Sequence, residues 1–404
     1  HSHEQRGAPQ PGPCCSTDNM GAGASRKKPP VLDDADDDAL FDAAFTNKVL
    51  NACYLDTREI RQRLTTCDAQ LRCVSGEYSA RYGSLVFRGL YADEPAKPCQ
   101  DRYGMVEVDG CPWFLILDGH GPNGHACAQF CLEELPRSFE EAQGSVEERL
   151  VEASVKTNKA LHKSKVESRD SGTTCVSLLV EDGVLYCSNV GDSRCVLGRK
   201  ENNSIKAIAL SKDQTLYRED ERQRIEASGG RVLSIGQIEG SVPMDHVWSC
   251  DLGQEIDSDG DPPRLWRKDA YEPGTAFSRS LGDFTAQELG CSSEPEVQKH
   301  VIDASDVCCV IATDGVWEFL TSQEVVDICV SCKTPKEACY RIVVESYRRW
   351  YSREERIDDI ACCVLYFDGA SSSDAVASPP PSRDAAPPPR LRRRGSIVAP
   401  PAAA

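Results

Sequence analysis

The sequence predicts an α+β protein in which antiparallel sheet is covered by helices. Two segments with alternating apolar residues, 173–180 and 183–190, are joined by Glu181-Asp182-Gly183. Such a pair is typical of an antiparallel hairpin. Apolar residues at helical spacing predict a helix near 124–135 and a longer helix from about 145 to 165. Hairpins that are interleaved with helices favour a layered α+β fold over a parallel α/β fold.

The remaining elements follow from the same patterns. Continuous apolar runs predict strands that are buried on both faces, and shorter alternating runs predict strands that have one exposed face. The expected elements are, in chain order, a strand near 84–88, strands within 104–117, helices 124–135 and 145–165, the hairpin 173–190, a strand at 194–198, and apolar strands at 307–313 and 360–367.

Composition divides the 404 residues into one large domain with extensions. The first segment is rich in Pro and Gly and then acidic, the last is rich in Pro, Ala and Arg, and both are typical of disorder. The expected divisions are a disordered extension 1–38, a helical extension 39–75, a domain 76–368 that contains a surface flap at about 234–273, and a disordered tail 369–404 that includes Ser396.

Charge and hydropathy exclude some classes of function. The formal net charge of −18 disfavours a nucleic-acid partner. No apolar run reaches the roughly 18 residues of a membrane span. Several of the 21 cysteines fall within apolar strands, such as Cys308 and Cys362, which is typical of core thiols in a reducing compartment. We therefore expect a cytoplasmic protein, with the nucleus as an alternative, and nothing in the sequence indicates an oligomer.

The segment Met20-Gly21-Ala22-Gly23-Ala24-Ser25 matches the pattern for N-terminal myristoylation. If Met20 is the start of the native protein, Gly21 would be acylated, and the basic residues 26–28 would support reversible attachment to a membrane. The alternative is an internal methionine in a disordered Gly/Ala-rich segment. The sequence leaves both hypotheses open.

Acidic residues stand where buried strands end. Asp118 follows the apolar run 113–117, and Asp314 follows the run 307–313. An Asp-Gly pair after a strand is usually only a turn. Further acids occupy similar settings, at Asp101, Asp283 and Asp358-Asp359. Carboxylates that gather without a Cys/His framework favour hard cations such as Mg²⁺ or Mn²⁺.

These motifs together resemble the metal-dependent type 2C Ser/Thr protein phosphatases (the PPM-type family). The resemblance runs in order from about Arg81 to Phe367, and any one motif by itself would be weak. The matching motifs are Lys97-Pro98-Cys99-Gln100-Asp101, Asp118-Gly119-His120-Gly121, Gly191-Asp192-Ser193-Arg194, Thr313-Asp314-Gly315-Val316-Trp317 and Asp358-Asp359, with others at 171–174, 210–213, 226–230, 277–283 and 294–297.

The resemblance implies a four-layer α-β-β-α sandwich, in which two antiparallel sheets are flanked by helices, with a two-metal centre at one end of the sheets. Asp118 would bridge the two ions. The Gly119 carbonyl and Asp101 would hold one ion, and Asp314 and Asp358 would hold the other. Asp213 and Glu318 would be ligands of a third, looser ion.

The family's reaction is the hydrolysis of phosphoserine and phosphothreonine in proteins by in-line attack of a water bound to both ions. His120 would protonate the leaving alkoxide. The sequence departs from the family near its first motif, where many members have a phosphate-binding arginine. Ala96 and Lys97 stand there, so Lys97 is the expected substitute as a point charge. Asp192, Arg194, Arg279 and Asp283 are expected to be supports near the site.

Two other functions remain as alternatives. A phosphatase-like chain without activity could serve as a binding module, but every primary metal acid is present. A hydrolase of small phosphate esters would also use strand-end acids, and activity on a phosphopeptide would distinguish it. We expect phosphorylated proteins as substrates and a monomeric enzyme.

Overall fold

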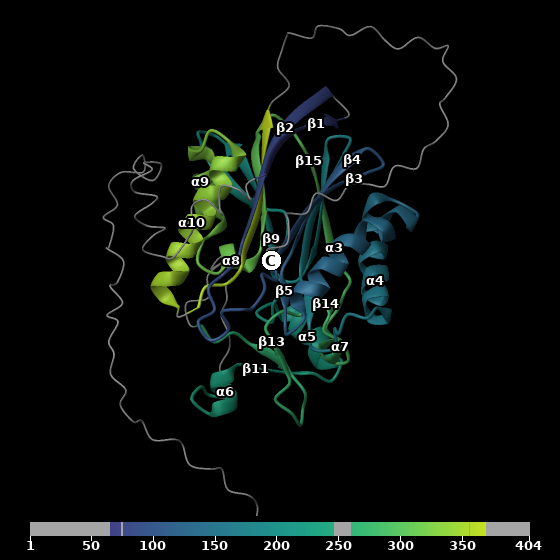
Figure 1. Cartoon of the computed structure of the whole chain (residues 1–404), viewed down its shortest axis with the longest axis vertical. Coiled ribbons are helices and arrows are strands. Elements are labelled where there is room, and N and C mark those ends of the chain that lie inside the picture. Colours follow the sequence, from purple (N-terminus) through teal and green to yellow (C-terminus); the bar gives the residue numbers. More distant parts are fainter. Residues whose placement is uncertain (1–64, 74–75, 246–259, 355, 369–404) are drawn as a thin grey trace, which may run out of the picture.

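The computed structural model contains two antiparallel sheets that pack against each other, with helices on both outer faces (Figure 1). The structure describes residues 65–73, 76–245, 260–354 and 356–368. The predicted disordered extension 1–38, the segment 39–64 and the predicted tail 369–404 lie outside this range, as does the centre of the flap. This layer order is the α-β-β-α sandwich that the sequence analysis expected, and the fold class is confirmed.

The larger sheet has six strands. Its spatial order is β1-β2-β17-β16-β9-β10, and every neighbouring pair is antiparallel. The strands are β1 (Thr65–Cys73), β2 (Gly76–Phe87), β17 (Ile360–Asp368), β16 (Asp306–Ala312), β9 (Arg194–Glu201) and β10 (Ser204–Ala209). The apolar run 307–313 becomes β16 at the centre of this sheet, which explains why it lacks alternation.

The second sheet has five strands in the order β15-β8-β7-β4-β3, again antiparallel. They are β15 (Glu296–Val301), β8 (Val184–Val190), β7 (Cys175–Glu181), β4 (Cys111–Leu117) and β3 (Arg102–Val108). The predicted hairpin is β7–β8, with φ of 49° at Asp182 and 76° at Gly183. Two consecutive positive φ values match the right-handed twist of the strands, which favours Asp-Gly at this turn.

The core has three layers. Side chains from both sheets meet between them, including Phe114, Val176 and Ile311. Helices α3 (Gly124–Glu141) and α4 (Val146–Lys163) cover the outer face of the five-stranded sheet. Helices α9 (Ser322–Ser331) and α10 (Pro335–Arg353) cover the six-stranded sheet. None of the described helices combines the length and the apolar character that crossing a membrane requires.

Two small sheets extend the sandwich at one end. One consists of β14 (Leu281–Gly282), β6 (Gly172–Thr173) and β5 (Gly119–His120). The other consists of β11 (Arg231–Leu233), β12 (Arg264–Trp266) and β13 (Pro273–Thr275), and lies beside α5 (Glu219–Ala227) and α6 (Ile235–Glu239). Two short helices, α7 (Phe284–Gln287) and α8 (Asp314–Trp317), complete the set. The expected flap therefore contains ordered sheet.

The prediction of a helical extension over 39–75 is wrong for its last part. Residues Thr65–Cys73 form strand β1, which pairs with β2 from Thr65↔Ser84 to Cys73↔Gly76. The apolar spacing that suggested helices lies before residue 56, outside the described residues. Hydrogen bonds to β2, which itself pairs with β17 in the sheet, decide the conformation here, because propensity is a weak guide where such pairing is available.

Candidate metal centre and catalytic cavity

Strand register brings the predicted metal acids together. Strands β3 and β4 pair Arg102 with Leu117, so Asp101 and Asp118 leave the sheet side by side. Strands β16 and β17 pair Ala312 with Cys362, which places Asp314, at the end of one strand, beside the start of the other. Both sheets end at this point. Four acids from distant parts of the chain therefore form one cluster, which comprises Asp101, Asp118, Asp314 and Asp358.

The cluster is electrostatically strained without a counter-charge. Burial, the charges of Asp314 and Asp101, and a hydrogen bond with Asp314 raise the pKa of Asp118 well above its usual range. Burial and the charge of Asp358 raise the pKa of Asp314 to about 6, although the hydrogen bond from Asp118 and the charge of Arg356 act in the opposite direction. Carboxylates in this position bind a proton or a cation readily.

Asp101 gives the clearest test of whether a metal would fit. Its side chain is 1% exposed, and its Oδ2 accepts a hydrogen bond from Thr313 Oγ1 at 2.9 Å. Its Oδ1 is buried and has no hydrogen-bond partner. Burial and then the charge of Asp359 raise the pKa of Asp101 well above its usual range. A buried carboxylate oxygen without a partner, among other carboxylates, fits a hard divalent cation.

Gly119 lies where no side chain could be accommodated. A Cβ atom at this position would lie 2.4 Å from the carbonyl oxygen of Gly124 and 2.8 Å from that of Gln100. The backbone therefore packs closely against the start of α3. This close approach explains the requirement for glycine directly after Asp118.

Asp358 and Asp359 have different environments although they are adjacent. Asp358 Oδ1 accepts a hydrogen bond from the Tyr91 hydroxyl at 2.7 Å. Asp359 is 3% exposed, and its two oxygens accept from the backbone N–H groups of Gly89 at 2.7 Å and Gln100 at 2.6 Å. Asp359 thus ties the start of β17 to the segment that leads into Asp101.

His120 pairs with Asp283. The distance from His120 Nε2 to Asp283 Oδ2 is 2.6 Å, and the imidazole packs on the Phe277 ring with centroids 4.4 Å apart. Burial disfavours the charged imidazole, but the charge and hydrogen bond of Asp283 outweigh burial and raise the pKa of His120. The small sheet of β5, β6 and β14 holds both residues in place. An imidazole held in this way can keep a proton near neutral pH.

A cavity of about 890 Å³ opens beside the acids. Its lining combines residues of the sandwich with residues of the flap. The predicted site residues among them are His120, Asp213, Asp314, Glu318 and Asp358. Lys97 is not among the described residues that line it. The Lys97 ammonium instead lies 3.7 Å from the centroid of the Tyr91 ring.

Comparisons with known proteins indicate the family of the chain. Residues 112–351 match the sequence model of the family described as Protein phosphatase 2C. This chain belongs to the protein phosphatase 2C family. It is 40% identical over 294 residues to "Probable protein phosphatase 2C 35" of Arabidopsis thaliana, and the matched region covers 71% of this chain and 83% of that relative. It is also 29% identical over 321 residues to "Probable protein phosphatase 2C 73" of Arabidopsis thaliana, covering 71% and 80%.

The fold has a counterpart among solved structures. The "serine-threonine phosphatase 2C from Toxoplasma gondii" superposes with a TM-score of 0.58 at 17% identity, covering 75% of this chain and 99% of that one. Membership of the family confirms the expected enzyme class, a metal-dependent protein serine/threonine phosphatase, and nothing in the described residues supports the inactive alternative.

In this type 2C phosphatase, Asp192 is a cavity residue that the sequence analysis treated only as a support. It lines the cavity, and burial followed by the charges of Asp314 and Asp213 raises its pKa to about 8. Asp213, by contrast, accepts two hydrogen bonds from Arg194, at 3.0 Å from Nε and 2.6 Å from Nη2. Asp192 follows the end of β8 after one glycine, Gly191, so the strand-end pattern that marked Asp118 could have indicated it.

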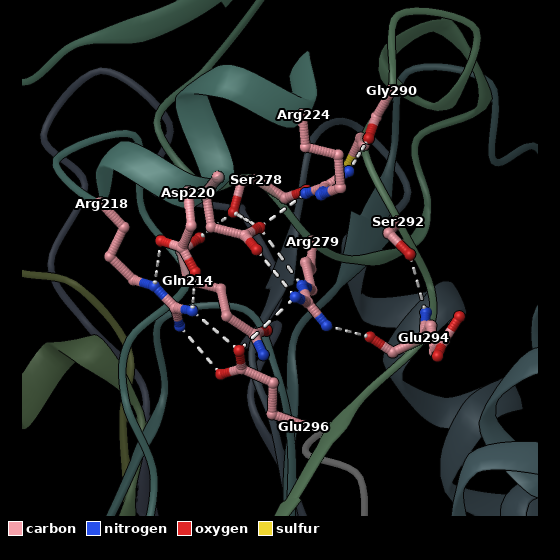
Figure 2. Close-up of polar contacts among 12 residues, drawn as sticks. Gln214, Arg218, Asp220, Arg224, Ser278, Arg279, Gly290, Ser292, Glu294 and Glu296 are labelled. Carbon is pink, nitrogen blue, oxygen red and sulfur yellow. Dashed lines mark hydrogen bonds and ion pairs between the residues drawn. The ribbon is translucent and has the colours of Figure 1, made fainter. Parts of the chain in front are cut away.

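A second group of acids lies outside the metal cluster. The carboxylates of Asp220, Glu221 and Glu296 lie within 4.8 Å of one another. Figure 2 shows Arg218 between Asp220 and Glu296, and it forms an ion pair with each of them. Arg279 forms an ion pair with Glu221 at 2.7 Å. Arg224 also binds Glu221, at 2.6 Å. The group is an ion-pair network that fixes α5 to the segment that leads to Asp283.

Proposed function

We propose that the cavity hydrolyses phosphoserine and phosphothreonine in proteins with two Mg²⁺ or Mn²⁺ ions. Asp118 would bridge the ions, Asp101 and the Gly119 carbonyl would hold one, and Asp314 and Asp358 would hold the other. The observation that carries this proposal is the unpartnered, buried Oδ1 of Asp101 within a cluster of carboxylates. An all-oxygen donor set suits both cations.

The bound ions would supply a water of lowered pKa and neutralise charge on the phosphate. The chain supplies the proton for the leaving group. Because Asp283 accepts from Nε2 of His120, the second N–H of the imidazolium, on Nδ1, would be the one given to the departing serine or threonine oxygen. Asp283 then serves to orient the ring and keep it charged.

A third ion is part of the proposal, with Asp213 and Glu318 as its expected ligands. Both line the cavity, but the carboxylate of Asp213 is engaged by Arg194. Asp192 offers a carboxylate in the same cavity whose raised pKa reflects a shortage of positive charge. Asp192, together with Glu318, would therefore hold the third ion in place of Asp213.

Phosphate release from a phosphothreonine peptide would test the function. Turnover with Mn²⁺ or Mg²⁺ should stop in chelator and fall at least about a hundredfold in Asp314→Asn, which removes a charged ligand. Asp327→Asn, on the exposed side of α9, is the matched control. A folded, metal-loaded protein that is inactive on phosphopeptides would favour the binding-module alternative. Preferential turnover of small metabolite esters would favour the other hydrolase.

We also propose a role for the flap and for the amino-terminal segment. Arg264 and Pro273 of the flap line the cavity, so this part would contact the phosphoprotein and influence substrate choice. The hypothesis of myristoylation at Gly21, with reversible membrane attachment of a cytoplasmic enzyme, concerns residues outside those that the structure describes. Mass spectrometry of the native protein tests it, since an unmodified Gly21 or retained residues 1–19 would contradict it.

A further inference from the structure

Six cationic side chains surround the catalytic cavity, and most of them are engaged. The set comprises Arg169, Arg194, Lys212, Arg218, Arg264 and Arg356. Arg194 and Arg218 form bonds of 2.6–2.8 Å with carboxylates, and Arg169 lies 3.6 Å from Glu288. A side chain held in this way is less available to a ligand.

Arg356 differs from these residues in position and environment. It precedes the metal acid Asp358 by two positions, and its Nη2 lies 4.0 Å from Asp358 Oδ2, too far for a hydrogen bond. Its side chain is 64% exposed. Arg356 therefore places a guanidinium group beside the metal acids. The planar N–H donors of this group remain accessible to a ligand in the cavity.

Arg264 approaches Arg356 from the flap. Its Nη1 donates to the Gly274 carbonyl at 2.9 Å, while its Nε is buried without a hydrogen-bond partner. Burial lowers the pKa of Arg264, and the charge of Arg356 lowers it further, although Asp261 acts in the opposite direction. Two guanidinium groups from distant segments thus repel each other at the edge of the cavity.

A phosphate dianion would convert this repulsion into attraction. Guanidinium groups bind phosphate through paired N–H donors, which gives both charge and geometric selectivity. We propose that Arg264 and Arg356 bind the phosphate group of the substrate. The assignment rests on the proposed phosphatase function and deepens it. It gives the arginine pair the contact that the sequence analysis expected of Lys97, whose ammonium lies over the Tyr91 ring.

Calorimetric titration of inorganic phosphate into the Mn²⁺-loaded full chain tests the assignment without turnover. Arg356→Ala and Arg264→Ala are each expected to raise the Kd for phosphate about tenfold, the range for loss of a charge-assisted hydrogen bond. Arg137→Ala, on α3 and 65% exposed, matches the first variant. Arg267→Ala, at a partly buried position directly after β12, matches the second. Both controls should stay within about twofold of wild type.

The outcomes separate this assignment from the phosphatase function itself. Unchanged phosphate affinity in both arginine variants, or a tenfold loss in Lys97→Ala alone, would overturn it. So would the absence of measurable phosphate binding in the wild type. Failure of the wild type to hydrolyse phosphopeptides would contradict the proposed function and leave the titration interpretable. If an alanine variant melts below the assay temperature, Arg356→Lys, which loses the fork but keeps the charge, should weaken binding by a smaller factor.

Discussion

Substitution of Asp192 by asparagine should stabilise the metal-free enzyme at neutral pH. The pKa of Asp192 is raised from 3.8 to about 8, chiefly by burial and by Asp314. A carboxyl whose folded-state pKa is raised binds its proton more tightly in the folded state. The stability of the folded state that this proton contributes is fully present below pH 3.8 and is lost as the pH rises through about 8. Asparagine resembles the protonated form at every pH.

The size of the effect follows from the pKa difference. Between pH 3.8 and pH 7 the shift spans about three units, each worth about 1.36 kcal/mol, so the upper bound is about 4 kcal/mol at pH 7. Because Asp192 is partly exposed and shares its charge interactions with Asp314, we expect about half of this value, about 2 kcal/mol. For a domain of this size, about 2 kcal/mol corresponds to a rise in Tm of about 5 °C.

Thermal unfolding followed by circular dichroism from pH 5 to pH 8, in chelator and in Mg²⁺, measures the effect. In chelator, the gap in Tm between Asp192→Asn and wild type should widen as the pH rises. In Mg²⁺ the gap should shrink, because a bound cation neutralises the carboxylate. Asp93→Asn, at an exposed position, controls for the loss of one negative charge.

Two results would refute this reasoning. One is a Tm gap in chelator that is constant or narrows from pH 5 to pH 8. The other is a metal-free Asp192→Asn protein that is less stable than wild type at pH 7. Either result would mean that a neighbouring group neutralises the negative charge of Asp192 in the metal-free protein.

Three further predictions concern the catalytic pair, the ion-pair network and the core. Asp283→Asn should lower the pKa of His120 and move the alkaline limb of the kcat/KM profile about one pH unit lower, since protonated His120 is the active form. Glu221→Gln should cost about 2 kcal/mol in urea unfolding, because it removes the buried negative charge that binds the partly buried Arg224 and Arg279. Val310→Ala, fully buried in β16, should cost about 2 kcal/mol, and Val301→Ala, 64% exposed, less than about 0.5 kcal/mol.

Each of these has a distinct contradicting outcome. An alkaline limb that does not move in Asp283→Asn would mean that another group sets it. For the network, Glu219→Gln on the exposed side of α5 is the control, and equal losses in the two glutamine variants would remove the special role of Glu221. Similar losses in the two valine variants would contradict the burial of β16.

Much of the fold was predictable because its signals are local. The β7–β8 turn needs Asp182-Gly183 at positive φ, and the apolar runs report burial on both faces. The helix at Val146–Lys163 begins with a capping box of Ser145 and Glu148. Strand β1 was not predicted, because its conformation depends on pairing with the next strand, β2, which the distant strand β17 holds in the sheet.

The order of the residues alone shows acids at strand ends, in the succession typical of a type 2C phosphatase. Turn chemistry and the period of burial are written in neighbouring residues, so they can be recognised without coordinates. Which charges remain available to a ligand in the cavity depends on the three-dimensional fold. Arg194 binds Asp213, whereas the charges of neighbouring acids raise the pKa of Asp192. Lys97 lies over the Tyr91 ring, and Arg356 lines the cavity. The partner of a charged side chain depends on strand register and loop packing, which decide between near neighbours, such as Asp213 for Arg194, and distant residues, such as Asp314 for Asp192.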